Sequence, residues 1–381
     1  MSWKEYKLKE ICSNIIDCVN KTAPTTDEKT PYKMLRTTNI RNGVIYEDDV
    51  KYVTKETFDI WTRRGTLKKG DILFTREAPL GEVGIVKNPE NFFLGQRIVL
   101  FRVNSNICDN RFILYSLLYR ENKESIIAKG VGSTVPHLRV PECENITLKI
   151  PDLAIQKKIA DILSAYDELI ENNNKQIKLL EEAAQRLYKE WFIDLRFPGH
   201  ESTKIVDGVP EGWTRTTLGN IIEIKYGKDH KSISDGDIPV YGSGGEISYC
   251  SQYLYDGESI LIPRKGSLNN ILYVNKKFWT VDTMFYSKIL CPQSGIFTYF
   301  CLKSFDMYSM NIGAAVPSMT INILKNLKII LPNPNILKKF QAINKNYFQK
   351  IDILIYQKKK LMQSRDKLLG KMMNYSLITA D

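Results

Sequence analysis

The chain has 381 residues, and Lys and Arg outnumber Asp and Glu by 54 to 43, which gives a net charge of +11. Hydrophobic residues make up 43% and charged residues 25%, as in ordinary folded proteins, and no segment approaches the roughly 20 apolar residues of a membrane span. The composition therefore excludes a membrane-spanning protein, and the length predicts two globular domains. A polyanion such as nucleic acid would explain the basic balance, although charge alone leaves that open.

Cysteine usage indicates the compartment. The seven cysteines are scattered, with no Cys-x-x-Cys pair and no Cys/His group at the spacing of a zinc site. Such a set is typical of free thiols in a reducing compartment, and the first residues lack the apolar core of a secretory signal. We therefore expect a cytoplasmic protein without a metal site.

In chain order, the predicted elements describe a mixed α/β protein with two long helices. The short strands are β-branched segments bounded by Gly, Asn or Pro, and the long helices lack both Pro and Gly. Residues 199–212 are polar and predict a linker between the two halves. The elements are strands at 72–75, 83–86 and 98–103, a helix at 110–120, a long helix at 154–192, strands at 260–263, 271–274 and 328–331, a helix at 295–304, and a second long helix at 336–369.

The chain is a divergent tandem repeat. Three groups of matching residues show the repeat. Near the start of each copy, Trp3, Leu8 and Ile11 match Trp213, Leu218 and Ile221 at an offset of 210 residues, and further on residues 72–76 resemble residues 260–264 at an offset of 188. Near the end of each copy, the offset is 181, where the matches are Gly132 with Gly313, Val135 with Val316, Pro136 with Pro317 and Pro151 with Pro332. The second copy has thus lost about 29 residues, all of them before Gly313. The N-terminal part of each copy varies freely, while the C-terminal part keeps a fixed length.

The fixed-length parts predict a helix pair. Apolar or permissive residues recur in the first long helix with alternating spacings of four and three, which is the a/d seam of a coiled coil. The seam is Ile155, Ile159, Ile162, Tyr166, Leu169, Asn173, Gln176, Leu180, Ala183 and Leu187, and it recurs 181 residues later. Two ordinary amphipathic core helices are the alternative. A repeat with pseudo-twofold symmetry favours two long antiparallel helices, in which the polar Asn173 and Gln176 could fix the register.

Several motifs resemble the specificity subunits of type I restriction–modification systems, the HsdS family. The segment from Pro151 to Leu163, continuing to Asp167, Ile170, Asn173 and Gln176, is similar to the central conserved region of that family. Residues 3–11, 70–81, 96–97, 210–221 and 240–245 are similar as well, so that the resemblance covers almost the whole chain. One departure is Leu337, which stands where the first copy has Gln156.

The resemblance implies an α+β fold with two mixed α/β target recognition domains joined by two long antiparallel helices. It places the first recognition domain at residues 1–150, the central conserved helix at 151–197, the second recognition domain at 198–332, and the C-terminal conserved helix at 333–381. Each domain would recognise one half of a bipartite, asymmetric site in double-stranded DNA. The helices would set the spacer and dock two methyltransferase (modification) subunits, which a translocating endonuclease (restriction) subunit would join.

The resemblance further implies that this chain has no catalysis, cofactor or membrane partner of its own. S-adenosylmethionine, ATP and Mg²⁺ would then bind to the partner subunits. The residues agree, since Asn333-Pro334-Asn335 lacks the second Pro and the aromatic residue of an adenine methyltransferase loop, and no Walker lysine loop is present. Two alternatives stay open: a stand-alone nuclease or methyltransferase with divergent catalytic domains, and a helical adaptor that binds no DNA.

DNA contacts are expected on polar, turn-like segments, because short polar side chains and arginine bind base edges and phosphates. We favour Arg76 and Arg264, which occupy the same repeat position after a strand. Gln96 and Asp282 could instead bond to neighbouring backbone, and Val135 and Val316 are expected to be structural. The full set is Arg36, Thr38, Asn39, Arg76, Glu77, Gln96, Arg97, Ser133, Thr134 and His137 in the first copy, and Tyr241, Ser243, Gly244, Arg264, Lys265, Ser267, Asp282, Thr283, Ser318 and Thr320 in the second.

Spacer and partner-docking positions are expected along the two long helices. They are Gln156, Ile159, Ile162, Tyr166, Leu180 and Leu187 in the first helix, and Phe340, Ile343, Leu361 and Leu368 in the second.

Overall fold

The computed structural model describes residues 3–132, 134–313 and 315–374. The chain divides into two compact units. Unit 1 comprises Met1–Asn172 and Gln357–Asp381, and unit 2 comprises Asn173–Tyr356. Ser133, one of the predicted DNA contacts, lies outside the described residues.

Unit 1 contains a four-stranded antiparallel sheet in the order β2-β10-β7-β8 and a three-stranded sheet in the order β6-β3-β9. The two sheets share a core, in which Leu35 and Phe92 pack with Leu73 and Leu100. The strands are β1 Lys4–Lys7, β2 Cys12–Asp17, β3 Lys33–Leu35, β4 Ile40–Arg41, β5 Val44–Ile45, β6 Lys51–Tyr52, β7 Ile72–Arg76, β8 Leu80–Ile85, β9 Phe92–Leu94, β10 Ile98–Val103 and β11 Thr147–Ile150.

Short helices cover the sheets of unit 1. They are α1 Leu8–Ile11, α2 Lys55–Trp61, α3 Asn110–Leu118, α4 Arg120–Ala128 and α5 Val140–Glu144. Helix α3 begins after Asp109, whose carboxylate accepts hydrogen bonds from the backbone N–H groups of Arg111 and Phe112, an N-cap that satisfies two otherwise free donors. Its Phe112 and Ile113 are fully buried in the main core of the unit.

Unit 2 is built on a six-stranded sheet in the order β15-β20-β18-β19-β16-β17, in which only the β16–β19 pair is parallel. The strands are β12 Ile205–Val206, β13 Val209–Pro210, β14 Thr214–Thr217, β15 Ile222–Tyr226, β16 Ile238–Gly242, β17 Gly245–Cys250, β18 Tyr255–Pro263, β19 Leu272–Thr280, β20 Met284–Ile289 and β21 Lys328–Leu331. Its short helices are α7 Gly295–Lys303 and α8 Ile321–Lys325.

The two units share one plan. The strand order β2-β10-β7 in unit 1 recurs as β15-β20-β18 in unit 2, and the pair β1–β11 recurs as β14–β21. Helix α3 follows β10 in the same way as α7 follows β20. The repeat in the sequence is therefore a repeat of folded units.

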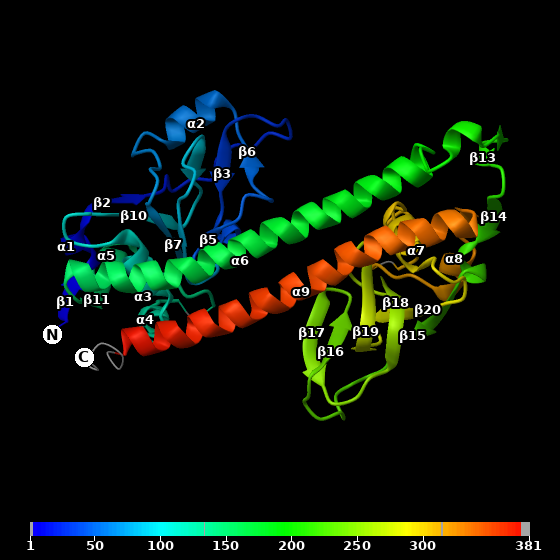
Figure 1. The fold of residues 1–381 in the computed structure, drawn as a ribbon. Helices are drawn as coiled ribbons and strands as arrows, with labels where there is room; N and C mark the ends of the chain where they lie inside the picture. The colour runs from blue at the N-terminus through cyan, green and yellow to red at the C-terminus, as the bar shows by residue number, and fades with distance from the viewer. Residues whose placement is uncertain (1–2, 133, 314, 375–381) are drawn as a thin grey trace. The chain divides into compact units, whose positions relative to one another are not determined.

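The two long helices are α6 Leu153–Tyr188, with 36 residues, and α9 Pro334–Met373, with 40 residues. A π-helical turn, Lys189–Ile193, follows α6. In each unit, a segment of α6 and a segment of α9 lie side by side in opposite directions (Figure 1). In unit 1 the ion pair between Asp167 and Arg365 joins them at 2.6 Å, and in unit 2 the rings of Tyr188 and Phe340 lie 6.4 Å apart. The predicted fold class, two mixed α/β domains with two long antiparallel helices, is confirmed.

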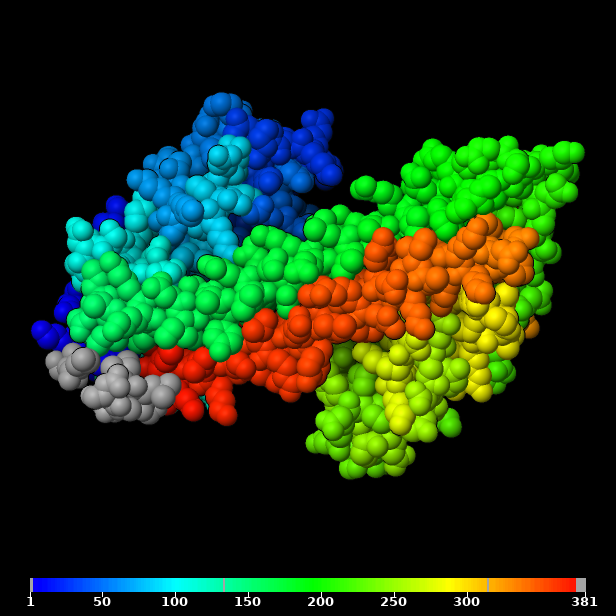
Figure 2. All heavy atoms as spheres, in the orientation of Figure 1, coloured from blue at the N-terminus to red at the C-terminus, as the bar shows by residue number. Residues whose placement is uncertain are grey.

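The predicted seam of α6 differs from the buried face by one residue near its middle. Ile162 and Leu169 are 44% and 50% exposed, whereas Leu163 is fully buried. The reason is geometric, since a straight helix with 3.6 residues per turn drifts away from a strict seven-residue repeat. Within each unit the long helices also keep a face that the sheet does not cover (Figure 2).

Local differences from the prediction arise from pairing that the sequence pattern does not reveal. The predicted linker at 199–212 contains the small hairpin β12–β13. Strand β19 extends to Thr280 because it pairs with β18 up to Phe278 and then with β16 at its last two residues. Among the described residues, no helix has the length and apolar character needed to cross a membrane.

Candidate nucleic-acid interface

Three segments of unit 1 meet at the end of strand β7. The backbone N–H of Arg76 donates to the carbonyl of Arg97 at 2.8 Å, and the N–H of Leu138 donates to the carbonyl of Arg76 at 3.0 Å. Glu77 and His137 pair as an antiparallel bridge. We call residues 76–79, 96–97, 131–132 and 134–138 edge 1.

The same arrangement recurs at the end of strand β18 in unit 2. The N–H of Arg264 donates to the carbonyl of Thr283 at 2.8 Å, and the N–H of Met319 donates to the carbonyl of Arg264 at 2.9 Å. Lys265 and Ser318 form the matching antiparallel bridge. We call residues 264–267, 281–283, 312–313 and 315–319 edge 2. Arg76 and Arg264 are therefore equivalent in the structure as well as in the sequence, because matching backbone hydrogen bonds join each arginine to the two segments beside it.

The equivalence extends to the neighbouring strand and identifies the partners of the two arginines. Since Arg97 matches Thr283, Val99 two residues later matches Phe285. Val99 lies opposite Asp17 on β2, and Phe285 lies opposite Tyr226 on β15. One repeat position therefore carries a carboxylate in unit 1 and a phenol ring in unit 2.

Arg76 is held inside unit 1. Its Nη2 bonds to Oδ1 of Asp17 at 3.0 Å and its Nη1 donates to the carbonyl of Leu138 at 3.1 Å. Its side chain is 15% exposed, and Nε is buried without a hydrogen-bond partner. Arg64 approaches the same carboxylate at 3.6 Å. Arg76 therefore joins β2, β7 and the 131–138 segment, and its donors face protein rather than solvent.

Arg264 is held differently. Its guanidinium lies over the ring of Tyr226, with 5.5 Å between Cζ and the ring centroid, and Nη1 donates to the carbonyl of Asp282 at 3.1 Å. Tyr226 is 56% exposed. In the described part of the chain, Nε and Nη2 of Arg264 have no hydrogen-bond partner. The stacked guanidinium is thus oriented while one of its edges stays open to an acceptor.

The other predicted contacts in unit 1 fall into two groups. Glu77 and Arg97 form an ion pair on edge 1, where Arg97 has a positive φ of 67°, and the amide of Gln96 lies 3.2 Å from Oγ1 of Thr22. Thr134 is exposed and His137 half-buried on the same edge. The remaining residues, Arg36, Thr38 and Asn39, belong to the segment around a short 3₁₀ turn.

Two of these three predicted residues, Arg36 and Asn39, bond within the protein. Arg36 is paired with Asp49 at 2.6 Å. Asn39 is 3% exposed, accepts a hydrogen bond from the N–H of Arg36, and donates to the carbonyl of Tyr46. Thr38 is exposed. In this conformation Thr38 can meet a ligand directly, whereas Asn39 cannot do so without giving up these bonds.

In unit 2, edge 2 brings together most of the predicted residues. Lys265, Ser267 and Asp282 are exposed, and Thr283 and Ser318 are half-buried. The turn that carries Ser243 and Gly244 lies next to the edge, because a Cβ atom on Gly266 would come within 3.1 Å of Oγ of Ser243.

Two predicted residues of unit 2 have structural surroundings. Tyr241 is 7% exposed within a small core, where burial raises the pKa of its phenol well above the usual range. Thr320 caps α8, since its hydroxyl accepts a hydrogen bond from the N–H of Ile323 at 3.3 Å.

Asp17 and Tyr226 are the residues that sequence reasoning missed. Strand β2 contains one extra residue at the register shift beside Arg102 and Val103, and β15 pairs without a shift. The offset between copies therefore falls from 210 at Ile11 to 209 at Asp17. Allowing a single β-bulge in the repeat alignment would have matched the two residues.

The predicted spacer residues are placed alike in both helices. Ile159 and its equivalent Phe340 are buried in the cores of their units, and Ile162 and its equivalent Ile343 are 44% and 38% exposed. The half-buried members are Tyr166, Leu180, Leu187, Leu361 and Leu368.

Gln156 has an internal role. It is 1% exposed, its Oε1 accepts from the N–H of Asp109 at 2.9 Å, and its Nε2 donates to the carbonyls of Ile107 and Pro151. It therefore attaches α6 to the start of α3. Because Gln156 is buried and bonded within unit 1, the presence of Leu337 at this position in the second copy does not indicate the loss of a contact with a partner subunit.

Unit 2 makes the equivalent attachment one helical turn later. Oε1 of Gln341 accepts a hydrogen bond of 3.2 Å from the N–H of Ile296 at the start of α7. Nε2 of Gln341 donates to the carboxylate of Glu258, which also accepts a hydrogen bond of 2.7 Å from the hydroxyl of Tyr273. A glutamine thus ties a long helix to the first turn of a short helix in both units, although the two glutamines are not equivalent in the repeat.

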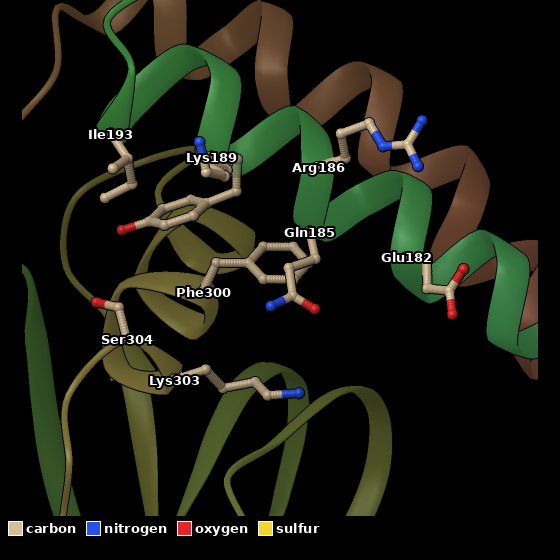
Figure 3. Close-up of a pocket in the computed structure, with 9 residues that line it drawn as sticks. Glu182, Gln185, Arg186, Lys189, Ile193, Phe300, Lys303 and Ser304 are labelled. Atoms are coloured by element: carbon tan, nitrogen blue, oxygen red, sulfur yellow. The ribbon is translucent and has the colours of Figure 1, made fainter. Parts of the chain in front are cut away.

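A hollow of about 440 Å³ lies between the last turns of α6 and helix α7 in unit 2. Figure 3 shows Phe300 and Gln185 close together in it, with Lys303 and Ser304 on the α7 side. The ring of Tyr188 stacks on Phe300 with centroids 5.5 Å apart, and Lys189 is paired with Asp194 at 2.6 Å. The hollow belongs to the helix surface rather than to edge 2.

No group of three or more His, Cys, Asp or Glu side chains with the geometry of a metal site occurs among the described residues. The polar groups that do gather at the two edges are hydrogen-bond donors and acceptors on short loops. Such groups are suited to binding a ligand with an extended, regular pattern of acceptors and donors, as DNA has.

Comparison with known proteins agrees over the whole repeat. A family model described as the type I restriction modification DNA specificity domain matches residues 1–182 and again residues 210–363. The MjaIX type I restriction enzyme specificity subunit of Methanocaldococcus jannaschii is 29% identical over 338 residues, covering 80% of this chain and 77% of that protein. The putative MjaX specificity subunit of the same organism is 28% identical over 412 aligned positions, covering 98% of this chain and 92% of that protein.

A solved structure has the same fold. The S subunit of the type I restriction–modification system of M. genitalium matches with a TM-score of 0.63 at 20% identity, covering 98% of this chain and 96% of that chain. Since the family model matches each half of the repeat and the two halves fold into units with equivalent loop edges, the chain belongs to the type I restriction–modification DNA specificity family.

Proposed function

We propose that this chain is the DNA-recognition subunit of a type I restriction–modification complex. Unit 1 binds one half of a bipartite, asymmetric DNA site through edge 1, and unit 2 binds the other half through edge 2. The chain itself performs no catalysis, and it directs methyltransferase and restriction subunits to the site.

The observation that carries this proposal is the duplicated edge with different side chains. Both edges have the same backbone bonds, around Arg76 in unit 1 and around Arg264 in unit 2. The side chains at equivalent positions differ, however: Asp17, Glu77 and Arg97 in unit 1 correspond to Tyr226, Lys265 and Thr283 in unit 2. The recognition of two different half-sites requires different side chains at the binding edges, and here one backbone arrangement carries two different sets of side chains.

Edge 2 supplies groups for both kinds of DNA contact. The open Nε/Nη2 edge of Arg264 matches the acceptors O6 and N7 of guanine, a pairing worth about 1–3 kcal/mol of discrimination. Asp282 is an acceptor suited to the amino group of cytosine, and Lys265, Ser243 and Ser267 are suited to phosphates.

Edge 1 recognises DNA through other residues. Arg76 positions the edge from inside, while Arg97 and Thr134 are exposed. Gln96 is half-buried, and its amide lies against Thr22, so it would have to leave that contact to meet DNA. Glu77 neutralises Arg97 in the free protein, so DNA binding at this edge exchanges an internal ion pair for contacts with bases or phosphates.

The long helices provide the surface for partner subunits. Ile162 on α6 is 44% exposed and Ile353 on α9 is 51% exposed, and the hollow beside Arg186 and Lys303 adds a basic and aromatic recess. Exposed apolar side chains rimmed by charge are typical of protein–protein contacts. Two methyltransferase subunits would dock here, carrying S-adenosylmethionine, while ATP and Mg²⁺ would bind to the restriction and modification subunits.

The test is to sequence the methylome of a host with and without this gene, in the presence of the modification subunits. We expect a bipartite motif that is methylated only when the chain is present. Purified chain incubated alone with DNA, Mg²⁺ and S-adenosylmethionine should show no turnover. Methylation or cleavage by the isolated chain would support a stand-alone enzyme and overturn the proposal.

A salt series separates a DNA-binding subunit from a helical adaptor. The affinity of the assembled complex for its duplex should fall steeply as salt rises, because Lys and Arg contacts release counterions from the phosphates. A duplex affinity that does not respond to salt would favour an adaptor that touches no DNA.

A further inference from the structure

Each edge carries an exposed pair of aliphatic side chains. In unit 1 these are Val131 and Val135, which are 44% and 43% exposed. In unit 2 they are Ile312 and Val316, which are 60% and 55% exposed. The positions are equivalent, since both pairs are related by the offset of 181, and we call each of them a tip pair. Val135 and Val316 were expected to be structural, but neither is packed into a core.

The backbone holds each tip pair in a closed loop. Val131 and His137 exchange two backbone hydrogen bonds of 2.9 Å, and the N–H of Ile312 donates to the carbonyl of Ser318 at 3.1 Å. Gly132 has a φ of +113°, and a Cβ atom there would lie 2.8 Å from the carbonyl oxygen of Val135. The positive φ and this close approach favour glycine at position 132. Val131 lies where the bonds to His137 close the loop, and Val135 lies within the loop; both side chains stay exposed.

Unit 2 closes its loop with an additional side chain. Oδ1 of Asn311 accepts from the N–H groups of Gly313 and Ser318 at 2.8 and 2.7 Å, and its Nδ2 donates to the carbonyl of Gly313 at 2.9 Å. A Cβ atom on Gly313 would lie 2.0 Å from the carbonyl oxygen of Val316, so this glycine is required as well. The two loops are thus closed by different hydrogen bonds, yet both leave their aliphatic pair exposed.

The tip pairs belong to the edges. In unit 1 the residue after the loop, Leu138, donates its N–H to the carbonyl of Arg76 and is 1% exposed. In unit 2 Met319 donates its N–H to the carbonyl of Arg264 and is 3% exposed. The chain therefore buries the first apolar residue after each loop and leaves the pair within the loop in water. The exposed Lys265 pairs with Ser318 beside the loop of unit 2, and Glu77 pairs with His137 beside the loop of unit 1, so both loops have charged neighbours.

A single exposed aliphatic residue is ordinary on a protein surface and carries no meaning. Here four of them recur at the same two positions in two units, although the charged residues Glu77 and Arg97 of edge 1 are replaced by Lys265 and Thr283 in edge 2. Moreover, the loops are continuous with the surface that is proposed to meet DNA. A shared apolar feature on otherwise different edges indicates a contact that both half-sites offer.

We propose that each tip pair makes an apolar contact with the bases of its half-site. The inference rests on the proposed function and deepens it. The apolar groups that DNA presents in its grooves are the methyl groups of thymine and, where a base step opens, the faces of the bases. In this account the arginine and polar residues of an edge discriminate by hydrogen bonds, while the tip pair adds contact area at the base edges.

The experiment uses the complex of the full chain with its modification subunits and a duplex carrying the motif found by methylome sequencing. Val135→Thr and Val316→Thr keep the branched shape and replace one methyl group by a hydroxyl. We expect each variant to bind the duplex about three- to tenfold more weakly, since one methyl group removed from water is worth roughly fourfold. Val206→Thr on the β12–β13 hairpin, where Val206 is 63% exposed, is the matched control and should bind like the wild type.

Scrambled duplexes assign each loss to a half-site. On a duplex in which the half read by unit 1 is scrambled, Val135→Thr should bind no more weakly than the wild type, whereas Val316→Thr should keep its defect. The opposite pattern is expected when the other half is scrambled. Replacement of thymines by uracil then identifies the contact: if one replacement abolishes the difference between wild type and variant, the contact is to that methyl group, and if none does, it is to a base face.

Two results would overturn the inference while leaving the proposed function intact. One is binding within twofold of the wild type for both variants. The other is a loss of modification subunits from the variant complexes, seen by their mass, which would make the tip pair a protein-docking element. If the wild-type complex prefers no duplex at all, the proposed function fails and the inference fails with it.

Discussion

The two units solve the same structural problem with the same arginine and opposite surroundings. Arg76 is closed in by the carboxylate of Asp17 and the carbonyl of Leu138, while Arg264 is stacked on the exposed ring of Tyr226 and keeps one edge open. The backbone bonds around both arginines are equivalent. Equivalent positions in a repeat therefore need not have the same role. A single residue two strands away in the sheet, Asp17 or Tyr226, decides whether the guanidinium is available.

The largest expected effect is on the stability of unit 1. Arg76→Ala removes the closer of the two arginines that pair with Asp17, whose side chain is 23% exposed, and leaves only Arg64 at 3.6 Å. It also removes the bond to the carbonyl of Leu138, and unit 1 should be destabilised by about 2–3 kcal/mol. Arg264→Ala, which breaks only a surface cation–π contact and one hydrogen bond, should lower stability by less than about 1 kcal/mol.

Hydrogen exchange resolved by peptide checks this prediction within each unit. Exchange should accelerate in β2 and β7 of the Arg76→Ala protein, and stay near the wild-type rate in β15 and β18 of the Arg264→Ala protein. Equal acceleration in both would remove the distinction between a structural and an available arginine.

The next effect concerns the glutamines that tie the long helices to the units. Gln156→Leu, which installs the residue of the second copy, leaves the N–H of Asp109 and the carbonyl of Ile107 without their partner and should destabilise unit 1 by about 2 kcal/mol. In unit 2, Gln341→Leu should have a similar effect, because Glu258 loses one of its two donors and the N–H of Ile296 loses its acceptor.

Leu337→Gln is the informative control for that pair. It introduces an amide at a position that is 1% exposed and already packed, so it should destabilise unit 2 rather than stabilise it. Thermal unfolding of the three variants measures this. A stabilised Leu337→Gln protein would mean that the attachment of unit 2 is incomplete and that Gln341 does not replace Gln156.

A smaller effect is expected from converting one arginine environment into the other. Tyr226→Asp places a carboxylate beside Arg264, as unit 1 has beside Arg76, and should neutralise its open edge. Binding of the complex to its duplex should weaken about tenfold, the equivalent of one lost base contact, with little change in stability. Tyr226→Phe keeps the ring under the guanidinium and is the control.

The outcome of that substitution is read by titrating fluorescent duplex with each complex. Unchanged binding by Tyr226→Asp would show that the open edge of Arg264 does not meet DNA. A defect of the same size in Tyr226→Phe would assign the effect to the phenol hydroxyl instead of to the arginine.

The smallest expected effect concerns the reactivity of one buried cysteine thiol in each unit. Burial raises the pKa of Cys108 in unit 1 and of Cys301 on α7 in unit 2 to about 11, because it disfavours the charged thiolate. Both thiols should therefore react slowly with iodoacetamide at pH 8 and faster as the pH approaches 11. Mass spectrometry of alkylated peptides from the folded protein checks this, and rapid labelling of either cysteine at pH 8 would show that its surroundings open.

The long-range plan of the molecule was readable from the sequence. The repeat offsets, the uninterrupted helical segments and the buried strands are patterns of burial, and burial follows directly from apolar spacing. The helix α6 was expected at 154–192 and occupies Leu153–Tyr188, with a π-helical turn after it. The heptad seam was less reliable, because Leu163 rather than Ile162 faces the core.

The candidate site was only partly readable. Arg76 and Arg264 were selected because they share a position, and the structure places both at equivalent edges. Their separate environments depend on Asp17 and Tyr226, which a β-bulge moves out of register in the alignment of the copies. Asn39 was selected as a polar residue in a turn, but whether such a residue caps its own turn or meets a ligand is decided by hydrogen-bond geometry that sequence does not contain.

The most direct test of two separate DNA readers is methylome sequencing of strains that carry the modification subunits with either the wild-type chain or Arg264→Ala. One half of the bipartite motif should relax at a defined base pair, while the other half and the spacing between them stay unchanged. A motif that relaxes in both halves, or that stays fully intact, would contradict the assignment of one half-site to each unit.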